Sequence, residues 1–270
     1  MEIICVGNEL LIGKTLNTNA TWMAKRATSL GMDVKRITVV ADDVDEIAVA
    51  TIEALNRKPR FIVTTGGLGP TFDDKTLEGI SKAVERKLEV NEKALEMVRA
   101  KYESYVKQGR IEKVDLTPPR IKMAKLPEKS EPLDNPVGTA PGVLLRVKGT
   151  TLIALPGVPP EMKAIFEESV VLLLKKQAGG TTFFETSIFA DSVMESALAP
   201  LIDQAMHENP WVYIKSHPKS EEEKPHIELH FSTTAKDSRT AKNRLEEAII
   251  QLSELIEKNG GVVKVQKRKP

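Results

Sequence analysis

The sequence predicts an α/β protein, a three-layer α/β/α sandwich with a mostly parallel sheet, plus a small α+β domain. Two observations predict this. Apolar runs of strand length alternate with helical periodicity over residues 1–176, an order typical of a parallel sheet covered on both faces. After Gly179 and Gly180 the pattern resets to strand, helix, strand, strand, helix. We expect one domain over residues 1–176 and another over 181–262, with the two glycines as a hinge.

The first elements of the chain each have a local signal. IICVG, from Ile3, is an apolar strand, and the segment behind it repeats apolar residues at helical spacing. Asn17 can cap this helix and Gly31 can end it. VKRITVV predicts a second strand and residues 44–55 a second helix, for which Asp43 is a candidate cap. RFIVTTGG predicts a third strand that runs into glycines, with a helix over residues 77–87.

The next segment departs from the alternation and then returns to it. Residues 91–107 predict a long charged helix, and TPPRIKMAKLP breaks the pattern, so we expect an excursion from the sheet. PGVLLRV and TLIALPG, three residues apart, predict a hairpin. The helix over residues 159–177 has proline at its start, where a missing N–H is harmless.

The second domain reads as a compact βαββα unit. We expect strands over residues 183–189, 211–216 and 226–232, and helices over residues 193–207 and 239–258. In HIELH, the side chains of His226, Glu228 and His230 share one strand face and could hold zinc. A solvated polar face explains the same alternation. Trp211 and Tyr213 alternate at strand spacing, which is typical of packing in a core or interface.

Composition limits the function classes. The 270 residues include 39 Lys and Arg against 38 Asp and Glu, for a net charge of +1, which argues against a surface for nucleic acid. No apolar run approaches the ~20 residues that cross a bilayer, and the start resembles no secretion leader, so we expect a cytoplasmic protein without membrane partners. The basic tail KVQKRKP reads as a solvated terminus. Cys5 reads as a core thiol.

A glycine loop follows the third predicted strand. Gly66, Gly67 and Gly69 leave backbone N–H groups uncovered just before a helix, which favours an anion. The loop has neither the Gly-Lys-Ser/Thr ending of a Walker loop nor the GxGxxG spacing. Asp73 and Asp74 would repel a phosphate unless a divalent cation intervenes. Because aspartate also suits a helix start, we expect one of the two to cap and the other to act.

Acidic residues follow two further predicted strands. Asp42 and Asp43 come after the second strand, and Glu9 follows the first. The carboxyl ends of parallel strands meet at one crevice, so Glu9, Asp42 and Asp74 are consistent with one site for a hard cation. Its task would be to generate hydroxide or to polarise a phosphoryl group.

Five segments together resemble a known family. GNELLIGKTLNTNA, the turn at Asp42, GGLGPTFDDKT, NPVGTAPG and LPGVPPEMK look like the N-terminal domain of the CinA proteins, in the molybdopterin-binding superfamily with MogA, MoaB and a MoeA domain. The resemblance covers residues 1 to about 175 and implies a molybdopterin-binding-like fold. It places the functional acidic pair on Asp42 and Asp74, which would hold the metal.

The resemblance also implies a binding surface. NPVGTAPG would press its backbone and Asn135 against a pterin or nucleotide, and LPGVPPE would form the opposite wall. Exposed Lys14 and Lys75 could assist. The expected substrate-binding residues are Gly7, Asn8, Glu9, Asn17, Gly66, Gly67, Leu68, Gly69, Thr71, Thr76, Asn135, Gly138, Thr139, Ala140, Pro156, Gly157, Pro159 and Glu161.

The main functional hypothesis is a metal-dependent hydrolase of the diphosphate bond in an ADP-ribose-like or FAD-like dinucleotide. The resemblance implies a divalent metal (Mg, Co or Mn), with potassium as a further candidate ion, and a homo-oligomer, for which a dimer is preferred over a trimer. Pterin adenylylation in molybdenum-cofactor biosynthesis is the alternative, and a binding module without turnover is the third. GGLG stands where MogA and MoaB have GGTG, which weakens a direct role in cofactor assembly. Nothing here resembles the deamidase domain found in many CinA proteins.

Overall fold

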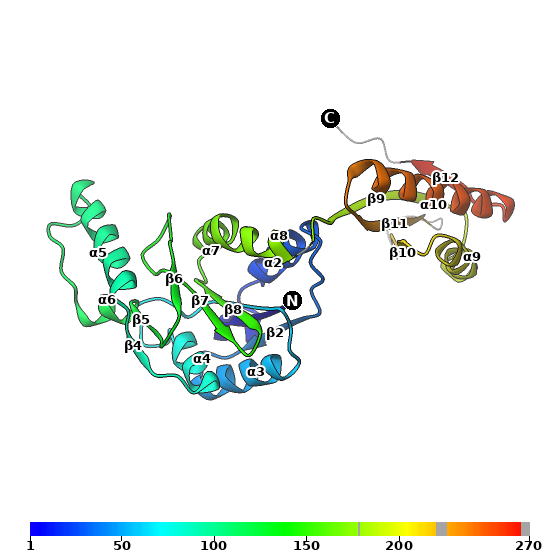
Figure 1. Ribbon diagram of the computed structural model, residues 1–270. Coiled ribbons are helices and arrows are strands. Elements are labelled where there is room, and N and C mark those ends of the chain that lie inside the picture. Colours follow the sequence, from blue (N-terminus) through cyan, green and yellow to red (C-terminus); the bar gives the residue numbers. More distant parts are fainter. Residues whose placement is uncertain (178, 220–225, 266–270) are drawn as a thin grey trace. The chain divides into compact units, whose positions relative to one another are not determined.

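Figure 1 shows a computed structural model of the chain, which describes residues 1–177, 179–219 and 226–265. Contacts within the chain divide it into two compact units. The first consists of residues 1–28 and 32–174, and the second of residues 29–31 with the chain from residue 175 onward. The predicted basic tail lies, from residue 266, outside the described residues.

A six-stranded sheet forms the centre of the first unit. Its strands follow the order β2 (Arg36–Val40), β1 (Glu2–Val6), β3 (Phe61–Thr65), β8 (Thr150–Leu155), β7 (Gly142–Val147) and β6 (Glu131–Leu133), and of these only β7 runs antiparallel to the others. The mostly parallel sheet and the β7–β8 hairpin were predicted. Strand β6, at only three residues, was not.

The register of the parallel strands aligns their carboxyl ends. Val6 lies opposite Val40, Cys5 opposite Thr65, and Thr65 opposite Leu155. The loops that begin at residues 7, 41, 66 and 156 therefore leave the sheet at one edge, where α/β sheets bind ligands.

Helices cover both faces of this sheet, which confirms the three-layer prediction. One face carries α3 (Val44–Asn56) and α4 (Thr76–Val84). The other carries α2 (Thr18–Ser29) and the helical run of α7 (Pro159–Ile165), a π-helical turn (Phe166–Val170) and α8 (Val171–Gln177) (Figure 1). The first loop holds a short helix that was not predicted, α1 (Asn8–Leu11), which has no buried residue.

Side-chain caps fix where several helices begin. Asn17 Oδ1 accepts a 3.1 Å hydrogen bond from the Ala20 amide, and Asp43 accepts from the amides of Asp45 and Glu46, so both predicted caps are confirmed. These hydrogen bonds lower the pKa of Asp43. The expected cap from Asp73 or Asp74 is wrong, because α4 begins after Lys75 without a side-chain cap.

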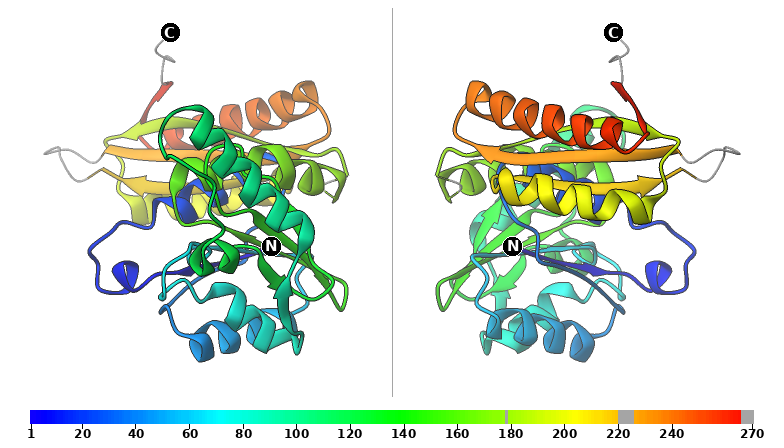
Figure 2. Two further views of the ribbon diagram at one scale, coloured as in Figure 1. Left: turned by 90° about the vertical axis from the view of Figure 1, so that its left-hand side faces the viewer. Right: turned by 90° about the vertical axis from the view of Figure 1, so that its right-hand side faces the viewer.

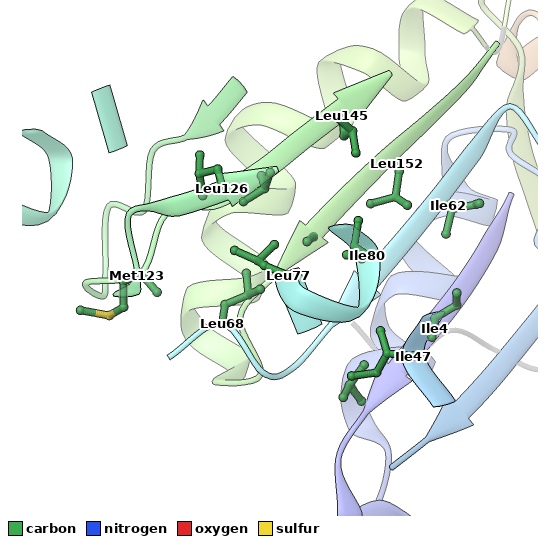
Figure 3. Packing of buried hydrophobic residues seen from close by; sticks show 14 of the residues in the cluster. Ile4, Ile47, Ile62, Leu68, Leu77, Ile80, Met123, Leu126, Leu145 and Leu152 are labelled. Atoms are coloured by element: carbon green, nitrogen blue, oxygen red, sulfur yellow. The ribbon is translucent and has the colours of Figure 1, made fainter. Parts of the chain in front are cut away.

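The predicted excursion is a helical segment held by a small sheet. Strands β4 (Leu88–Val90) and β5 (Lys125–Pro127) pair antiparallel, and between them lie α5 (Glu92–Lys107) and α6 (Pro118–Lys122). Met123 and Leu126 belong to the same buried cluster as Leu68 and Leu77 (Figure 3). The excursion therefore shares its core with the glycine loop.

The second unit is a four-stranded antiparallel sheet with two helices. Its elements are β9 (Thr182–Asp191), α9 (Glu195–Glu208), β10 (Val212–Pro218), β11 (His226–Ala235), α10 (Ser238–Lys258) and β12 (Val262–Val265), with strand order β10-β11-β9-β12. In Figure 2 the helices α9 (yellow) and α10 (orange) run alongside these strands. Strand β12 extends the predicted βαββα pattern, which was incomplete.

The polar face of β11 holds separate ion pairs. His226 contacts Asp191 at 2.5 Å, His230 contacts Glu185 at 3.0 Å, and Glu228 pairs with Lys219 at 2.7 Å. In the described ranges no three His, Cys, Asp or Glu side chains group as metal ligands do. The zinc hypothesis for this strand is therefore wrong, and the solvated polar face is the correct reading.

Three further expectations concern single residues and membranes. Cys5 is buried in β1, as predicted for a core thiol, and this burial raises the pKa of the thiol. Trp211 and Tyr213 are 67% and 58% exposed, so they do not belong to the core. Among the described residues, no helix combines the length and apolar character that a membrane span needs.

Candidate functional site

A cavity of about 480 Å³ opens at the carboxyl edge of the first unit's sheet. Its floor comes from the strand ends at Val6, Thr65 and Pro156. This volume lies within the roughly 300–1,000 Å³ of small-molecule sites. The cavity draws residues from all five segments that carry the family resemblance.

Most of the predicted site residues line this cavity. They are Gly7, Glu9, Asn17, Asp42, Gly66, Gly67, Leu68, Gly69, Thr71, Asp74, Thr139, Ala140, Pro156, Gly157, Pro159 and Glu161. The cavity also has lining residues that sequence reasoning missed, namely Val6, Leu10, Thr15, Leu16, Thr18, Asn19, Thr65, Pro70 and Val158. Asp73, which was considered with Asp74, lines it as well.

Four predicted binding residues do not line the cavity. Asn8, Thr76, Asn135 and Gly138 lie outside its lining. The structure gives all four of them hydrogen bonds that shape the loops around the cavity, so these polar groups are already used within the protein. Lys14 and Lys75 are also absent from the lining.

The glycine loop begins with a close approach between two strand ends. Gly66 has φ +105°, and a Cβ there would lie 2.2 Å from the carbonyl oxygen of Val6, so only glycine fits. The Gly66 carbonyl accepts a 2.8 Å hydrogen bond from the fully buried Thr76 hydroxyl. Thr76 thus anchors the loop to the start of α4 and is a positioning residue.

A tight turn closes the glycine loop. The Thr71 amide donates a 2.8 Å hydrogen bond to Asp74 Oδ2. The Thr71 hydroxyl lies 2.5 Å from both Asp74 Oδ2 and Asp73 Oδ1. Its hydrogen bond is the largest cause of the lowered pKa of Asp73. Both carboxylates therefore face back to Thr71 instead of capping α4, since the turn needs the same acceptors that a cap would use.

Asp42 is held from the neighbouring strand. The Asn8 amide donates to Asp42 Oδ2 at 2.7 Å, and the Asp42 amide donates to Asn8 Oδ1 at 3.4 Å. This reciprocal pair ties the loop after β1 to the loop after β2. Asn8, predicted as a ligand contact, is thereby used to place Asp42.

The acidic residues do not form a complete metal site. No three His, Cys, Asp or Glu side chains of the described ranges cluster as ligands, so Glu9, Asp42 and Asp74 are not brought together as one ligand group. The reason is local, because Asp42 and Asp74 are each held by the backbone of a separate loop. Two carboxylates in one cavity still fit Mg²⁺, which proteins hold through one or two carboxylates plus substrate phosphates.

The wall that the NPVGTAPG loop forms depends on a buried asparagine. Asn135 is 5% exposed, and its Nδ2 donates to Glu161 Oε2 at 2.7 Å and to the Ala140 carbonyl at 2.8 Å. Its Oδ1 accepts from the Gly138 amide at 2.8 Å. Asn135 therefore shapes the NPVGTAPG loop and orients Glu161, which lines the cavity.

Asn19 links the end of β3 to the LPGVPPE segment, and both belong to the cavity lining. Its Nδ2 donates to the Gly157 carbonyl at 2.8 Å and lies 3.2 Å from the Thr65 hydroxyl. The sequence signal for this residue was weak, since Asn19 stands two positions after the cap Asn17 and reads as an ordinary polar helix residue.

Comparison with known proteins agrees with this geometry. Residues 2–176 match the family described as "Probable molybdopterin binding domain". The chain belongs to this family. The molybdopterin-binding domain family thus covers the whole sheet and every segment that lines the cavity.

Full-length relatives occur in archaea. A protein of Sulfurisphaera tokodaii is 43% identical over 263 residues, 97% of each chain, and one of Caldivirga maquilingensis is 45% identical over 252 residues, 93% of this chain and 94% of that one. The crystal structure of "the protein CinA with unknown function" from Thermoplasma acidophilum is 44% identical, with a TM-score of 0.57, and the match covers 66% of this chain and 96% of that chain. The similarity to CinA expected from the motifs is confirmed.

Proposed function

We propose that the chain binds a phosphorylated molybdopterin-type pterin in the cavity at the sheet edge. The observation that carries this proposal is the convergence of the glycine loop, Asp42 and Asp74 on one cavity. Uncovered backbone amides favour a phosphate, and the remaining volume suits a planar ring. Membership of the molybdopterin-binding domain family supports a pterin over other rings.

Each part of the cavity has a separate task in this proposal. The predicted free amide of Gly66 is wrong, because it donates to the Leu155 carbonyl at 3.0 Å. The amides from Gly67 to Gly69 would therefore hold the phosphate, and Asn135 sets the wall against which the ring lies. Mg²⁺ that arrives with the phosphate would be held by Asp42 and Asp74 and would neutralise charge as it develops. Backbone hydrogen bonds hold both carboxylates in place beside the phosphate, from the Asn8 amide to Asp42 and from the Thr71 amide to Asp74.

A bound pterin phosphate allows adenylylation. In this reaction a phosphate oxygen of the pterin attacks the α-phosphorus of ATP, and pyrophosphate leaves. The protein would contribute mainly orientation and electrostatic stabilisation, since phosphoryl-type transfers need little covalent help.

Hydrolysis of an ADP-ribose-like or FAD-like dinucleotide is the second candidate. The specific observation in its favour is that two acidic side chains stand beside the amide loop, where they can orient a water for in-line attack on phosphorus. The products would be AMP and the other phosphate ester.

One screen separates these activities. The protein is incubated with ATP plus molybdopterin, with ADP-ribose, or with FAD, each with Mg²⁺, Co²⁺ or Mn²⁺, with and without K⁺. Pyrophosphate release that needs molybdopterin supports adenylylation, and AMP release from ADP-ribose or FAD supports the hydrolase. Calorimetric binding of molybdopterin without any product supports a binding module. If no binding and no product occur with any ligand, the proposed function is wrong.

A further inference from the structure

Lys122 reaches the glycine loop from behind the cavity. Its Nζ donates to the carbonyl oxygens of Thr71 and Asp74, the latter at 2.7 Å. These two residues are the first and last of the turn that the Asp74 amide closes through a 3.3 Å hydrogen bond to Thr71 O. One ammonium group therefore bridges both ends of the turn that carries Asp74.

The backbone around Lys122 is well anchored. Helix α6 begins with two prolines, and the guanidinium of Arg120 lies 3.8 Å above the ring of Tyr102 on α5. The next residues, Met123 and Ala124, are 2% and 0% exposed. Lys122 thus extends from a fixed base to a loop some 50 positions away in sequence.

A second lysine holds the other wall in the same manner. Lys101 of α5 donates a 2.8 Å hydrogen bond to the carbonyl oxygen of Pro136, in the NPVGTAPG loop. Neither lysine lines the main cavity. The α5–α6 excursion therefore sends one ammonium group to each of two loops that line the cavity.

We infer that Lys122 and Lys101 are positioning residues, and that the α5–α6 excursion is a brace that fixes the spacing of the two ligand-binding loops. Hydrogen bonds from an ammonium group to carbonyl oxygens are stronger than neutral ones. Lys122 is half-buried, so solvent replaces these bonds only in part. The brace sets where Asp74 lies, and its effect on the ligand passes through that carboxylate. This part of the inference rests on the proposed function.

The first test needs no ligand. Hydrogen exchange is followed by mass spectrometry in Lys122→Met and in Lys93→Met, a matched control from an exposed position of α5. In Lys122→Met we expect exchange about 10-fold faster in peptides that cover residues 69–76, with β1 and β3 unchanged. Lys101→Met should affect only residues 135–140. Wild-type exchange in both loops of these variants would overturn the inference.

The second test is a double-mutant cycle on affinity, with molybdopterin and AMP, each with Mg²⁺, as probes. Lys122→Met should weaken binding about 10-fold in the wild-type background and by less than about 2-fold in Asp74→Asn, because interacting sites are not additive. Equal losses in both backgrounds would show that Lys122 does not act through Asp74 and would overturn the mechanism.

A conservative variant, a replacement variant and the behaviour of the wild-type protein keep the test decisive. Lys122→Arg retains charged donors and should restore both slow exchange and affinity. If Lys122→Met does not fold, Lys122→Gln is used in its place. If wild-type protein binds neither probe, the proposed function fails for these ligands, while the exchange experiment still decides whether the brace exists.

Discussion

The backbone amide of Asn8 donates a 2.7 Å hydrogen bond to the carboxylate of Asp42. This contact joins the end of β1 to the end of β2 at the rim of the cavity. It uses one carboxylate oxygen, Oδ2. The position of Asp42 is therefore set by the backbone at the start of α1, independently of any ligand.

The acidic pair should control metal-dependent binding. We expect Asp42→Asn and Asp74→Asn each to weaken Mg²⁺-dependent binding of molybdopterin at least about 10-fold, since each removes a charge that holds the cation. Calorimetry with Mg²⁺ and with EDTA measures this. Asp45→Asn is the control, because Asp45 is exposed on α3 and outside the cavity. Equal affinity of all three variants would contradict the proposed role.

The Asn135–Glu161 contact predicts a rescue experiment. Asn135→Asp places a carboxylate against Glu161 Oε2, where the amide now donates at 2.7 Å. Like charges at this distance should lower the free energy of unfolding by about 2 kcal/mol. Adding Glu161→Gln restores a donor and should recover most of this loss in urea denaturation. A double variant no more stable than Asn135→Asp would show that the contact does not orient the wall.

The cap of α3 predicts a pH dependence. Hydrogen bonds from the amides of Glu46 and Asp45 lower the pKa of Asp43 in the folded state. A lowered pKa means that the cap's charge-dependent stabilisation is present above the unfolded pKa of about 3.9 and is lost as pH falls through the folded value.

Calorimetry at several pH values tests this cap. Asp43→Ala should melt about 2–4 °C below wild type at pH 7, and the gap should narrow toward pH 3. Asp43→Asn, which keeps an acceptor but loses the charge, should melt between Asp43→Ala and wild type at pH 7. A gap that is constant with pH would show that the charge of Asp43 contributes nothing.

A buried ion pair at the opposite end of β1 predicts a stability loss. Arg57 Nε and Nη2 contact the Glu2 carboxylate at 2.9 and 2.7 Å, and the Glu2 side chain is 5% exposed. Arg57→Ala leaves that carboxylate without its cation and should lower the free energy of unfolding by about 2–4 kcal/mol. Urea denaturation measures it. Glu2→Gln in the same chain should recover part of the loss, and no recovery would assign the effect to packing.

Local patterns were sufficient for most of the fold. The parallel strands and their helices were predictable because each is long enough to show its periodicity, and because Asn17 and Asp43 mark helix starts. The short strands β4, β5 and β6 have three residues each, too few for a period to appear. Strand β12 was missed for the same reason, with four residues.

The sequence was sufficient to predict those site residues that lie just after the ends of parallel strands. Asp42 and Gly66 come directly after strands, so the parallel sheet alone brings them together. The local hydrogen bonds of Asp74 and Asn135 were not predictable, because an aspartate before a helix serves a cap or a turn equally well, and a buried asparagine looks like a ligand contact in sequence. Lys122 has no local signal at all, since its partners lie some 50 positions earlier in the chain.

Much of the cavity is built from glycine, proline and the main chain at Gly66 through Gly69 and at Pro156 and Gly157. Main-chain groups are nearly the same in every amino acid. A side-chain substitution therefore alters them only if it changes the path of the chain. Under the proposed function, relatives whose surface residues differ widely should therefore bind the same pterin ligand. A change in ligand specificity within this family should come from insertions or deletions in these loops more often than from point substitutions.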